Sequence, residues 1–140
     1  MNNIEIDSTN LQQAAAALPA NTPILMLNLL RYKQQADYGD DTNKPPCSGR
    51  EAYFKNYIPA FNKIAMSIPG IQPFFIGDAL QHLVAPANEV WDNIALIEYP
   101  DFASFLAVIQ HPTYAADAEP HRLAALEDWR LIVTVKANIL

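Results

Sequence analysis

Residues 23–32 have the sequence PILMLNLLRY, an almost uninterrupted apolar run that begins with a proline. A run of this kind predicts a β-strand that is buried on both faces, because a strand with one solvated face alternates apolar and polar residues. Within residues 24–30 both alternating sets of positions are apolar, apart from Asn28. We therefore expect this strand at the centre of a sheet, with a covering layer on each side.

The segments on either side of this strand predict a helix and a long loop. Residues 8–18 fit a helix, because Thr9 and Gln12 match a capping box and the alanines that follow have high helix propensity. Residues 33–48 are polar and contain Gly39 and a pair of prolines. A loop of this length is either a functional lid or a disordered insertion.

The rest of the chain alternates between helical and strand patterns. Residues 49–67 have apolar side chains at helical spacing, and Pro59 among them predicts a kink or a break. The remaining predictions are a strand over 71–85 with a bulge or bend at Gly77, a strand over 91–99, a helix capped by Asp101, a second helical piece over 114–127, and a strand over 129–135.

After the N-terminal helix, the predicted order βαββαβ is typical of the ferredoxin-like fold. We expect one α+β domain over residues 1–140, with a four-stranded antiparallel sheet and both helices on one face. The face without helices then needs a second cover, since the central strand is apolar on both sides. Charged residues make up only 17% of the chain, less than is usual for a soluble domain. We therefore expect a homodimer in which two sheets pack face to face.

Charge and composition exclude several classes of partner. The net charge is −6, and the nine lysines and arginines are scattered, whereas nucleic-acid binding and anionic membranes need clustered basic residues. No apolar run approaches the roughly 20 residues of a membrane span, and the N-terminus shows no secretory signal. A single cysteine, Cys47, permits no intrachain disulfide. By elimination we expect a cytoplasmic protein.

Four segments resemble the bacterial family called domain of unknown function 1330. They are PILMLNLLRYK, GREAYFKNY, WDNIALIEYPDFASFLAVIQHPTY and HRLAALEDWRLIVT, and together they span about residues 23–135. The resemblance implies a dimeric α/β barrel built from ferredoxin-like subunits, and it implies no established activity. Relatives in that superfamily include cofactor-free monooxygenases, lactone isomerases and haem enzymes, so the implied chemistry is broad.

Two polar residues interrupt strands that are otherwise apolar. Asn28 needs hydrogen-bond partners if it is buried, and these are either a ligand or water in a cavity, or neighbouring backbone. Glu98 shares its strand parity with Ile94 and Leu96. It is a candidate general acid or base, and the alternative is an ion pair near the end of the sheet with Arg31, Arg122 or Arg130.

The predicted helices supply the other candidates. Arg122 and His121 would bind an anionic ligand group, since a guanidinium pairs well with carboxylates, unless they are ordinary surface residues. Tyr53, Tyr57 and Tyr114 would line a pocket, unless they are core residues with the hydroxyl at the edge.

Motifs for metals and common cofactors are absent. No two histidines are spaced i, i+4, and the chain has no HExxH, CxxC, GxSxG or glycine-rich phosphate loop. We therefore expect neither a metal nor a cofactor. The function that these features favour is small-molecule binding, with a cofactor-free monooxygenase- or isomerase-like enzyme for a small organic acid or aromatic compound as the finer hypothesis. The alternative is a non-catalytic dimeric domain with a structural or regulatory role.

Overall fold

Four antiparallel strands form a single sheet in the order β2-β3-β1-β4. A computed structural model describes residues 2–41 and 43–138, and the strands are β1 (Ile24–Tyr32), β2 (Gln72–Asp78), β3 (Asn93–Tyr99) and β4 (Leu126–Thr134). The apolar strand β1 lies at the centre of the sheet, as predicted. The order and directions of the strands confirm the ferredoxin-like α+β fold.

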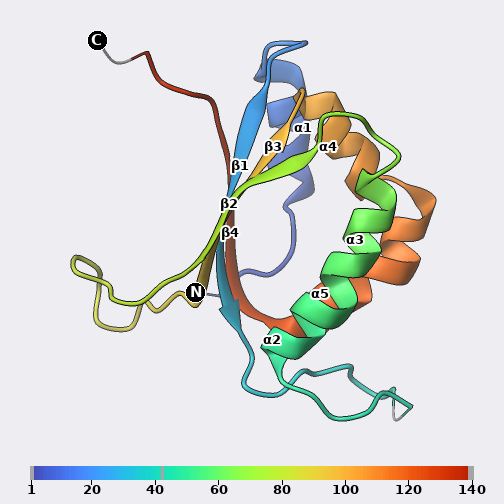
Figure 1. The fold of residues 1–140 in the computed structure, drawn as a ribbon, viewed down its shortest axis with the longest axis vertical. Coiled ribbons are helices and arrows are strands. Elements are labelled where there is room, and N and C mark those ends of the chain that lie inside the picture. The colour runs from blue at the N-terminus through green and yellow to red at the C-terminus, as the bar shows by residue number, and fades with distance from the viewer. Residues whose placement is uncertain (1, 42, 139–140) are drawn as a thin grey trace.

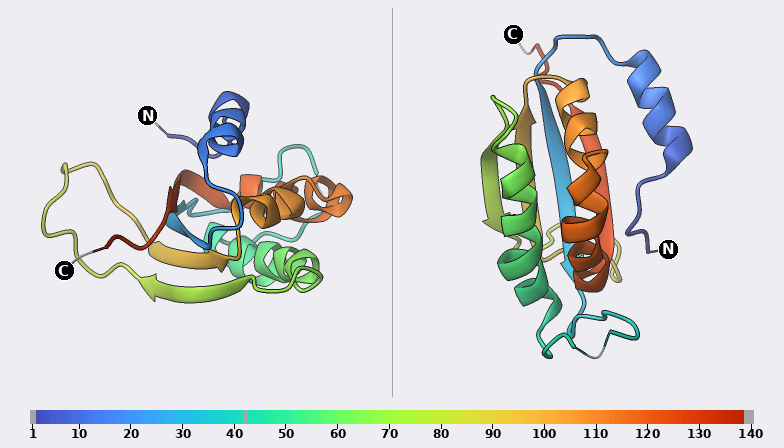
Figure 2. Two further views of the ribbon diagram at one scale, coloured as in Figure 1. Left: turned by 90° about the horizontal axis from the view of Figure 1, so that it is seen from above. Right: turned by 90° about the vertical axis from the view of Figure 1, so that its right-hand side faces the viewer.

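Two helical segments cover one face of the sheet (Figures 1 and 2). The first consists of α2 (Gly49–Glu51), the π-helical turn η1 (Ala52–Tyr57) and α3 (Ile58–Ala65); the second consists of α4 (Phe102–Ile109), the π-helical turn η2 (Tyr114–Ala118) and α5 (Glu119–Ala125). Asp101 caps α4 by accepting a hydrogen bond from the backbone N–H of Ser104 at 2.8 Å, as predicted. No helix of the described chain covers the opposite face of the sheet, which is called the open face below.

Two prolines in the helices, Pro59 and Pro120, each follow a π-helical turn. Pro59 and Pro120 each lie in the first turn of an α-helix. Just before them, the N–H of Ile58 bonds to the carbonyl of Tyr53, and the N–H of Glu119 bonds to that of Tyr114. A proline in a regular helix clashes with the carbonyl four residues earlier, and a π turn widens the helix at that point. The helix therefore continues through Pro59, where the sequence predicts a kink or a break.

The N-terminal helix α1 (Ser8–Ala17) lies beyond the β4 edge of the sheet (Figure 2). Its cap is Asp7, whose side chain accepts from the N–H of Asn10, so the capping box predicted at Thr9 and Gln12 is wrong. Asp7 has extended backbone angles and can cap, whereas Thr9 already lies within the helix.

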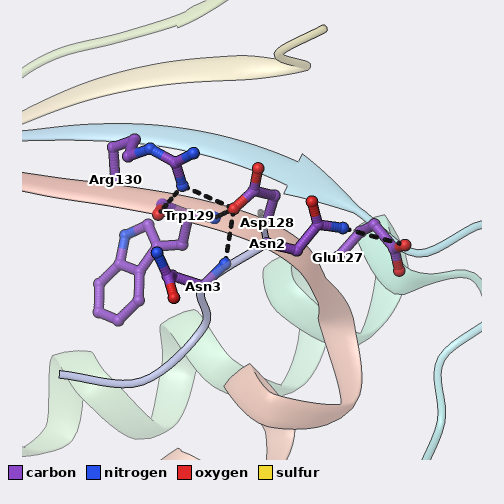
Figure 3. Close-up of polar contacts among 6 residues, drawn as sticks. All are labelled: Asn2, Asn3, Glu127, Asp128, Trp129 and Arg130. Atoms are coloured by element: carbon purple, nitrogen blue, oxygen red, sulfur yellow. Dashed lines mark hydrogen bonds and ion pairs between the residues drawn. The ribbon is translucent and has the colours of Figure 1, made fainter. Parts of the chain in front are cut away.

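The segment before α1 is attached to β4 through Asp128 (Figure 3). One oxygen of Asp128 accepts hydrogen bonds from the N–H of Asn3 at 2.9 Å, from the N–H of Trp129 at 2.9 Å and from Arg130 at 2.6 Å. Burial alone would raise the pKa of Asp128, but these hydrogen bonds and the charge of Arg130 together hold that pKa below its ordinary value. The carboxylate therefore fixes the N-terminal segment to the sheet in its charged form.

Strand β2 ends earlier than predicted, and its irregularity lies elsewhere. The register shift is between Pro73 and Phe75 rather than at Gly77. Gly77 has a different role, because a Cβ there would lie 2.6 Å from the ring of Phe75. Residues 79–92 leave the sheet as a loop on the side of the open face (Figure 1), although their leucines and valines favour a strand by composition.

The long loop over 33–48 is anchored to the C-terminal end of α5. The N–H of Lys33 bonds to the carbonyl of Ala125, and the N–H of Asp37 bonds to that of Ala124. Within the loop, the N–H of Ala36 bonds to the carbonyl of Cys47. These backbone hydrogen bonds connect the described parts of the loop, residues 33–41 and 43–48, to the helical layer and to each other. None of the helices in the described part of the chain has the length and apolar content needed to cross a membrane.

Candidate functional site

A cavity of about 270 Å³ lies between the sheet and the helices. The register of β1 on β3, in which Asn28 faces Ala95, fixes which side chains reach it. Asn28 and Leu30 of β1 alternate with residues of the open face, as do Asn93, Ala95 and Ile97 of β3. Most of the wall is aromatic or aliphatic, and its principal residues are Leu30, Tyr53, Phe54, Tyr57, Phe61, Ile76, Ala95, Ile97, Tyr99, Phe105, Tyr114, Trp129 and Leu131.

The two π-helical turns bring three tyrosines to this cavity. Tyr53 and Tyr57 come from η1 and Tyr114 from η2, and all three are buried. The rings of Tyr53 and Tyr57 lie 4.9 Å apart, and the hydroxyls of Tyr57 and Tyr114 are 2.9 Å apart. The structure thus brings together the three tyrosines that the sequence marks as candidates, from helices far apart in the chain.

A buried guanidinium lies directly behind Tyr114. Arg122 is only 2% exposed, and its Nη1 donates to the Tyr114 hydroxyl at 2.8 Å. Its Nη2 donates to the carbonyl of Ile4 at 3.3 Å, and its plane lies over Trp129 with the guanidinium carbon 4.7 Å from the ring centroid. The Arg122 Nε has no hydrogen-bond partner among the described residues.

The Asn28 amide has one good hydrogen bond, at its oxygen, and one weak contact, at its nitrogen. Its Oδ1 accepts from the indole N–H of Trp129 at 3.0 Å. Its Nδ2 makes a single long contact, 3.4 Å, to the carbonyl of Met26. An amide nitrogen carries two N–H groups, so at least one of them has no protein acceptor in the described chain. Asn93, by contrast, uses both ends of its amide in contacts to Arg50, Gly77 and Asp78.

Burial keeps Tyr53 and Tyr57 protonated. Removal from water raises the pKa of Tyr57 well above its ordinary value, and it raises the pKa of Tyr53 as well. The nearby charge of Arg122 acts in the opposite direction on both groups and is outweighed. At neutral pH these side chains are therefore neutral hydroxyls that can donate hydrogen bonds.

Glu98 does not reach this cavity. It faces Leu25 across the sheet, in the set of side chains that belongs to the open face, and its carboxylate accepts from the amide of Gln72 at 2.7 Å. Glu98 shares its parity with Ile94 and Leu96, as predicted, but side chains of that parity face away from the helices. The predicted site combining Asn28, Glu98 and Arg122 is therefore not formed.

His121 and Arg122 also point to different places. The ring of His121 bonds to the hydroxyl of Tyr38 at 2.6 Å and lines an open groove beneath the loop over 33–48. Burial and the charge of Lys44 lower the pKa of His121. Successive helix residues diverge by about 100°, so the anion site expected from their adjacency is split. Tyr38 and Asn56 complete this outer group.

Two contributors to the cavity are missing from the sequence-based candidates. Trp129 is the partner of Asn28, and its alternation with Leu131 along the last strand is the available signal. The π turns also have a signature, because Tyr53 and Tyr114 each come six positions before a proline (53 to 59 and 114 to 120). Within residues 2–41 and 43–138, no group of histidine, cysteine and carboxylate side chains is arranged to hold a metal ion.

Comparison with known proteins shows similarity to solved structures alone. No family model matches the chain, so the resemblance to domain of unknown function 1330 stays a prediction, and no curated protein matches either. A dabb family protein with a ferredoxin-like fold from Mesorhizobium loti is 14% identical, with a TM-score of 0.51 over 83% of this chain and 98% of that chain. At that identity the likeness shows the fold alone.

The RPA0582 protein, described as a protein of unknown function from Rhodopseudomonas palustris, is much more similar. Its structure is 31% identical with a TM-score of 0.80, covering 99% of this chain and 100% of that one. The structure of the methylated RPA0582 protein is 29% identical with the same TM-score, covering 98% of this chain and 96% of the other. The chain therefore belongs to the same family as the RPA0582 protein of Rhodopseudomonas palustris.

Proposed function

We propose that this protein binds a small, largely apolar molecule in the cavity between the sheet and its helices. The observation that carries the proposal is an aromatic and aliphatic cavity of about 270 Å³ with a few polar groups at its wall. Sites for small molecules have this composition, and an apolar cavity of about 150 Å³ already binds benzene. The size suits a compound built on a single aromatic ring.

Hydrogen-bonding capacity that the protein leaves unused supports this proposal. The Tyr53 hydroxyl makes no hydrogen bond to a described residue, and Asn28 retains a free N–H, as described above. Buried polar groups are nearly always paired, either with protein or with a bound molecule. A ligand or ordered water in the cavity would complete both groups.

The finer hypothesis, a cofactor-free enzyme acting on a small organic acid or aromatic compound, needs a different set of groups from those predicted. Glu98 is not its base, because it lies on the open face with Gln72 as partner. Among the described residues that line the cavity there is no carboxylate or histidine. Among the described lining residues, the titratable side chains are tyrosines.

Filling the cavity tests the proposal. Toluene and indole are titrated into the wild-type protein and into Ala95→Leu, which adds a larger side chain to the cavity wall, and binding is followed by calorimetry. Ala107→Leu is the matched control, because the same change there adds the side chain to the exposed side of α4. We expect binding to the wild type and to the control and at least a tenfold loss in Ala95→Leu. Equal binding to both variants would place the ligand elsewhere.

We also propose that two copies associate through the open face. Its side chains include Leu25, Leu27, Leu29, Ile94, Leu96 and Ile132, and contiguous apolar surface of this kind marks interaction sites. The loop over 79–92 projects on the same side (Figure 1) and exposes Leu80, Leu83 and Val84, the last being 98% exposed. Every copy of the protein carries this same apolar patch, so two copies can pack patch to patch in a symmetric pair.

A further inference from the structure

We infer that the hydrogen-bonded series Arg122–Tyr114–Tyr57 recognises an anionic oxygen, a carboxylate or phenolate, on an aromatic ligand. This inference rests on the proposed binding cavity. The first step is the direction of the hydrogen bonds. A guanidinium has donors only, so the Tyr114 oxygen is the acceptor in its 2.8 Å contact with Arg122. The hydrogen-bonded series therefore begins at a fixed positive charge on Arg122 and continues through Tyr114 to Tyr57.

The second step counts hydroxyl protons. Tyr57 and Tyr114 have two protons between them, and their 2.9 Å contact uses one, whichever atom is the donor. The other proton has no acceptor among the described residues, and both tyrosines line the cavity. The pair therefore offers one free O–H donor to whatever the cavity holds, and hydrogen bonding to Arg122 polarises that donor.

The third step is charge. The Arg122 guanidinium is 2% exposed, and the nearest carboxylate oxygen, on Glu119, is 3.8 Å away on a side chain that is 41% exposed. That partner is too distant and too hydrated to neutralise a buried cation fully. Trp129 and Tyr114, which enclose the guanidinium, are themselves part of the cavity wall. The positive charge thus lies one side-chain layer behind the cavity.

The fourth step is the balance of donors and acceptors at the wall. The oxygen of Asn28 is already bonded to Trp129, and its Nδ2 has one long contact to the Met26 carbonyl, which leaves at least one of its N–H groups for the cavity. The described lining residues include no carboxylate that would repel an anion. At the part of the wall formed by Asn28, Tyr57 and Tyr114, a ligand oxygen that only accepts, next to a buried cation, matches the free groups better than a donor or a cation does.

A matched pair of ligands separates this inference from the proposed function. Benzoate and benzamide have nearly the same shape, and benzoate alone carries an anionic oxygen at pH 7. Calorimetric titration of the wild-type protein should give benzoate about tenfold or more tighter binding than benzamide. In Tyr57→Phe the preference should fall to about threefold or less. In the control Tyr32→Phe, which removes a buried hydroxyl outside the cavity wall, it should be unchanged.

The outcomes have distinct meanings. If the wild-type protein binds both compounds equally and Ala95→Leu weakens both, the cavity binds ligands and the inference about an anionic oxygen is overturned. If neither compound binds, or both bind Ala95→Leu as well as wild type, the proposed function itself is overturned. Retention of the full benzoate preference in Tyr57→Phe would also refute the role of the hydrogen-bonded series Arg122–Tyr114–Tyr57.

A second test uses the wild-type protein alone, so it does not depend on whether any variant folds. 4-Nitrophenol changes its absorbance when it becomes a phenolate, so the ionised form of the bound dye can be titrated directly. We expect bound dye to ionise at a lower pH than free dye, because the cation and the donated O–H stabilise the phenolate. Ionisation of the bound dye at a higher pH than that of the free dye would show an uncompensated apolar cavity and overturn the inference.

Discussion

Replacing Tyr114 with phenylalanine removes the one oxygen that joins Arg122 to the rest of the cavity wall. The ring and its packing stay, so the change isolates the hydroxyl. Tyr57→Phe removes a hydroxyl whose sole described partner is Tyr114, and Tyr53→Phe removes a hydroxyl without a described partner. The three variants therefore differ in the number and the kind of hydrogen bonds lost, on side chains of identical size.

The hydrogen bonds that each variant loses predict how much its free energy of unfolding decreases. A hydrogen bond to a charged group contributes about 1.5–3 kcal/mol, and a neutral one about 0.5–1.5 kcal/mol. Tyr114→Phe loses one of each and leaves a second nitrogen of the buried Arg122 without a partner, so we expect it to lower the free energy of unfolding by about 2–4 kcal/mol. Tyr57→Phe should cost about 1 kcal/mol, and Tyr53→Phe should be close to neutral.

Urea unfolding of the three variants and of the Tyr57→Phe/Tyr114→Phe double variant measures these differences. All samples are compared at one protein concentration, since association would make stability depend on it. The double variant should be no less stable than the sum of the single changes predicts, because the two tyrosines share a bond. If Tyr114→Phe lowers the free energy of unfolding no more than Tyr57→Phe does, the hydrogen bond from Arg122 contributes nothing to stability. The hydrogen-bonded series that begins at Arg122 is then refuted.

Three further predictions concern the fold and its surfaces. Gly49→Ala should lower the free energy of unfolding by about 3 kcal/mol or more, because a Cβ there would lie 2.3 Å from the carbonyl oxygen of Lys33 and 2.5 Å from that of Ala125; a thermal melt unchanged from wild type would contradict this. The pKa of Asp128 lies below its ordinary value in the folded protein, so its stabilisation is complete above about pH 4 and is lost as the pH falls through the folded-state pKa. Asp128→Asn should therefore destabilise the protein at pH 7 and show a flatter loss of stability toward acid than wild type, whereas parallel pH profiles would exclude this carboxylate. Leu83→Asp should shift the molar mass measured by light scattering from that of two chains to that of one, and an unchanged mass would remove the loop over 79–92 from the interface.

The fold was predictable because its evidence is repeated along the chain. The doubly apolar strand over 23–32, the helical spacing over 49–67 and the Asp101 cap each constrain a local element, and their order leaves few topologies. The errors lie where local composition and tertiary context disagree. The leucines and valines after Asp78 favour a strand, yet the ladder between β2 and β3 ends at Asp78, and residues 79–92 continue as a loop outside the sheet.

The cavity was predictable only in part, because a strand pattern separates two faces without saying which one lies under the helices. Glu98 and Asn28 both interrupt apolar strands, and sequence alone treats them alike. The register that sets Asn28 opposite Ala95 and Leu25 opposite Glu98 assigns them to opposite faces. The tyrosines show the complementary case, since their positions mark them as candidates but their contacts depend on the π turns before Pro59 and Pro120.

Those two π turns connect helix chemistry to the function proposed for the cavity. Each turn accommodates a proline that a regular helix would not tolerate, and each begins within one residue of a tyrosine that lines the cavity. A π turn costs helix stability and is found preferentially at functional sites. Here the widened turns place the hydroxyls of Tyr57 and Tyr114 at 2.9 Å from one another, with Arg122 next in line. The same prolines that look like helix breaks in the sequence therefore belong to the structure that presents a polarised O–H donor to an otherwise apolar cavity.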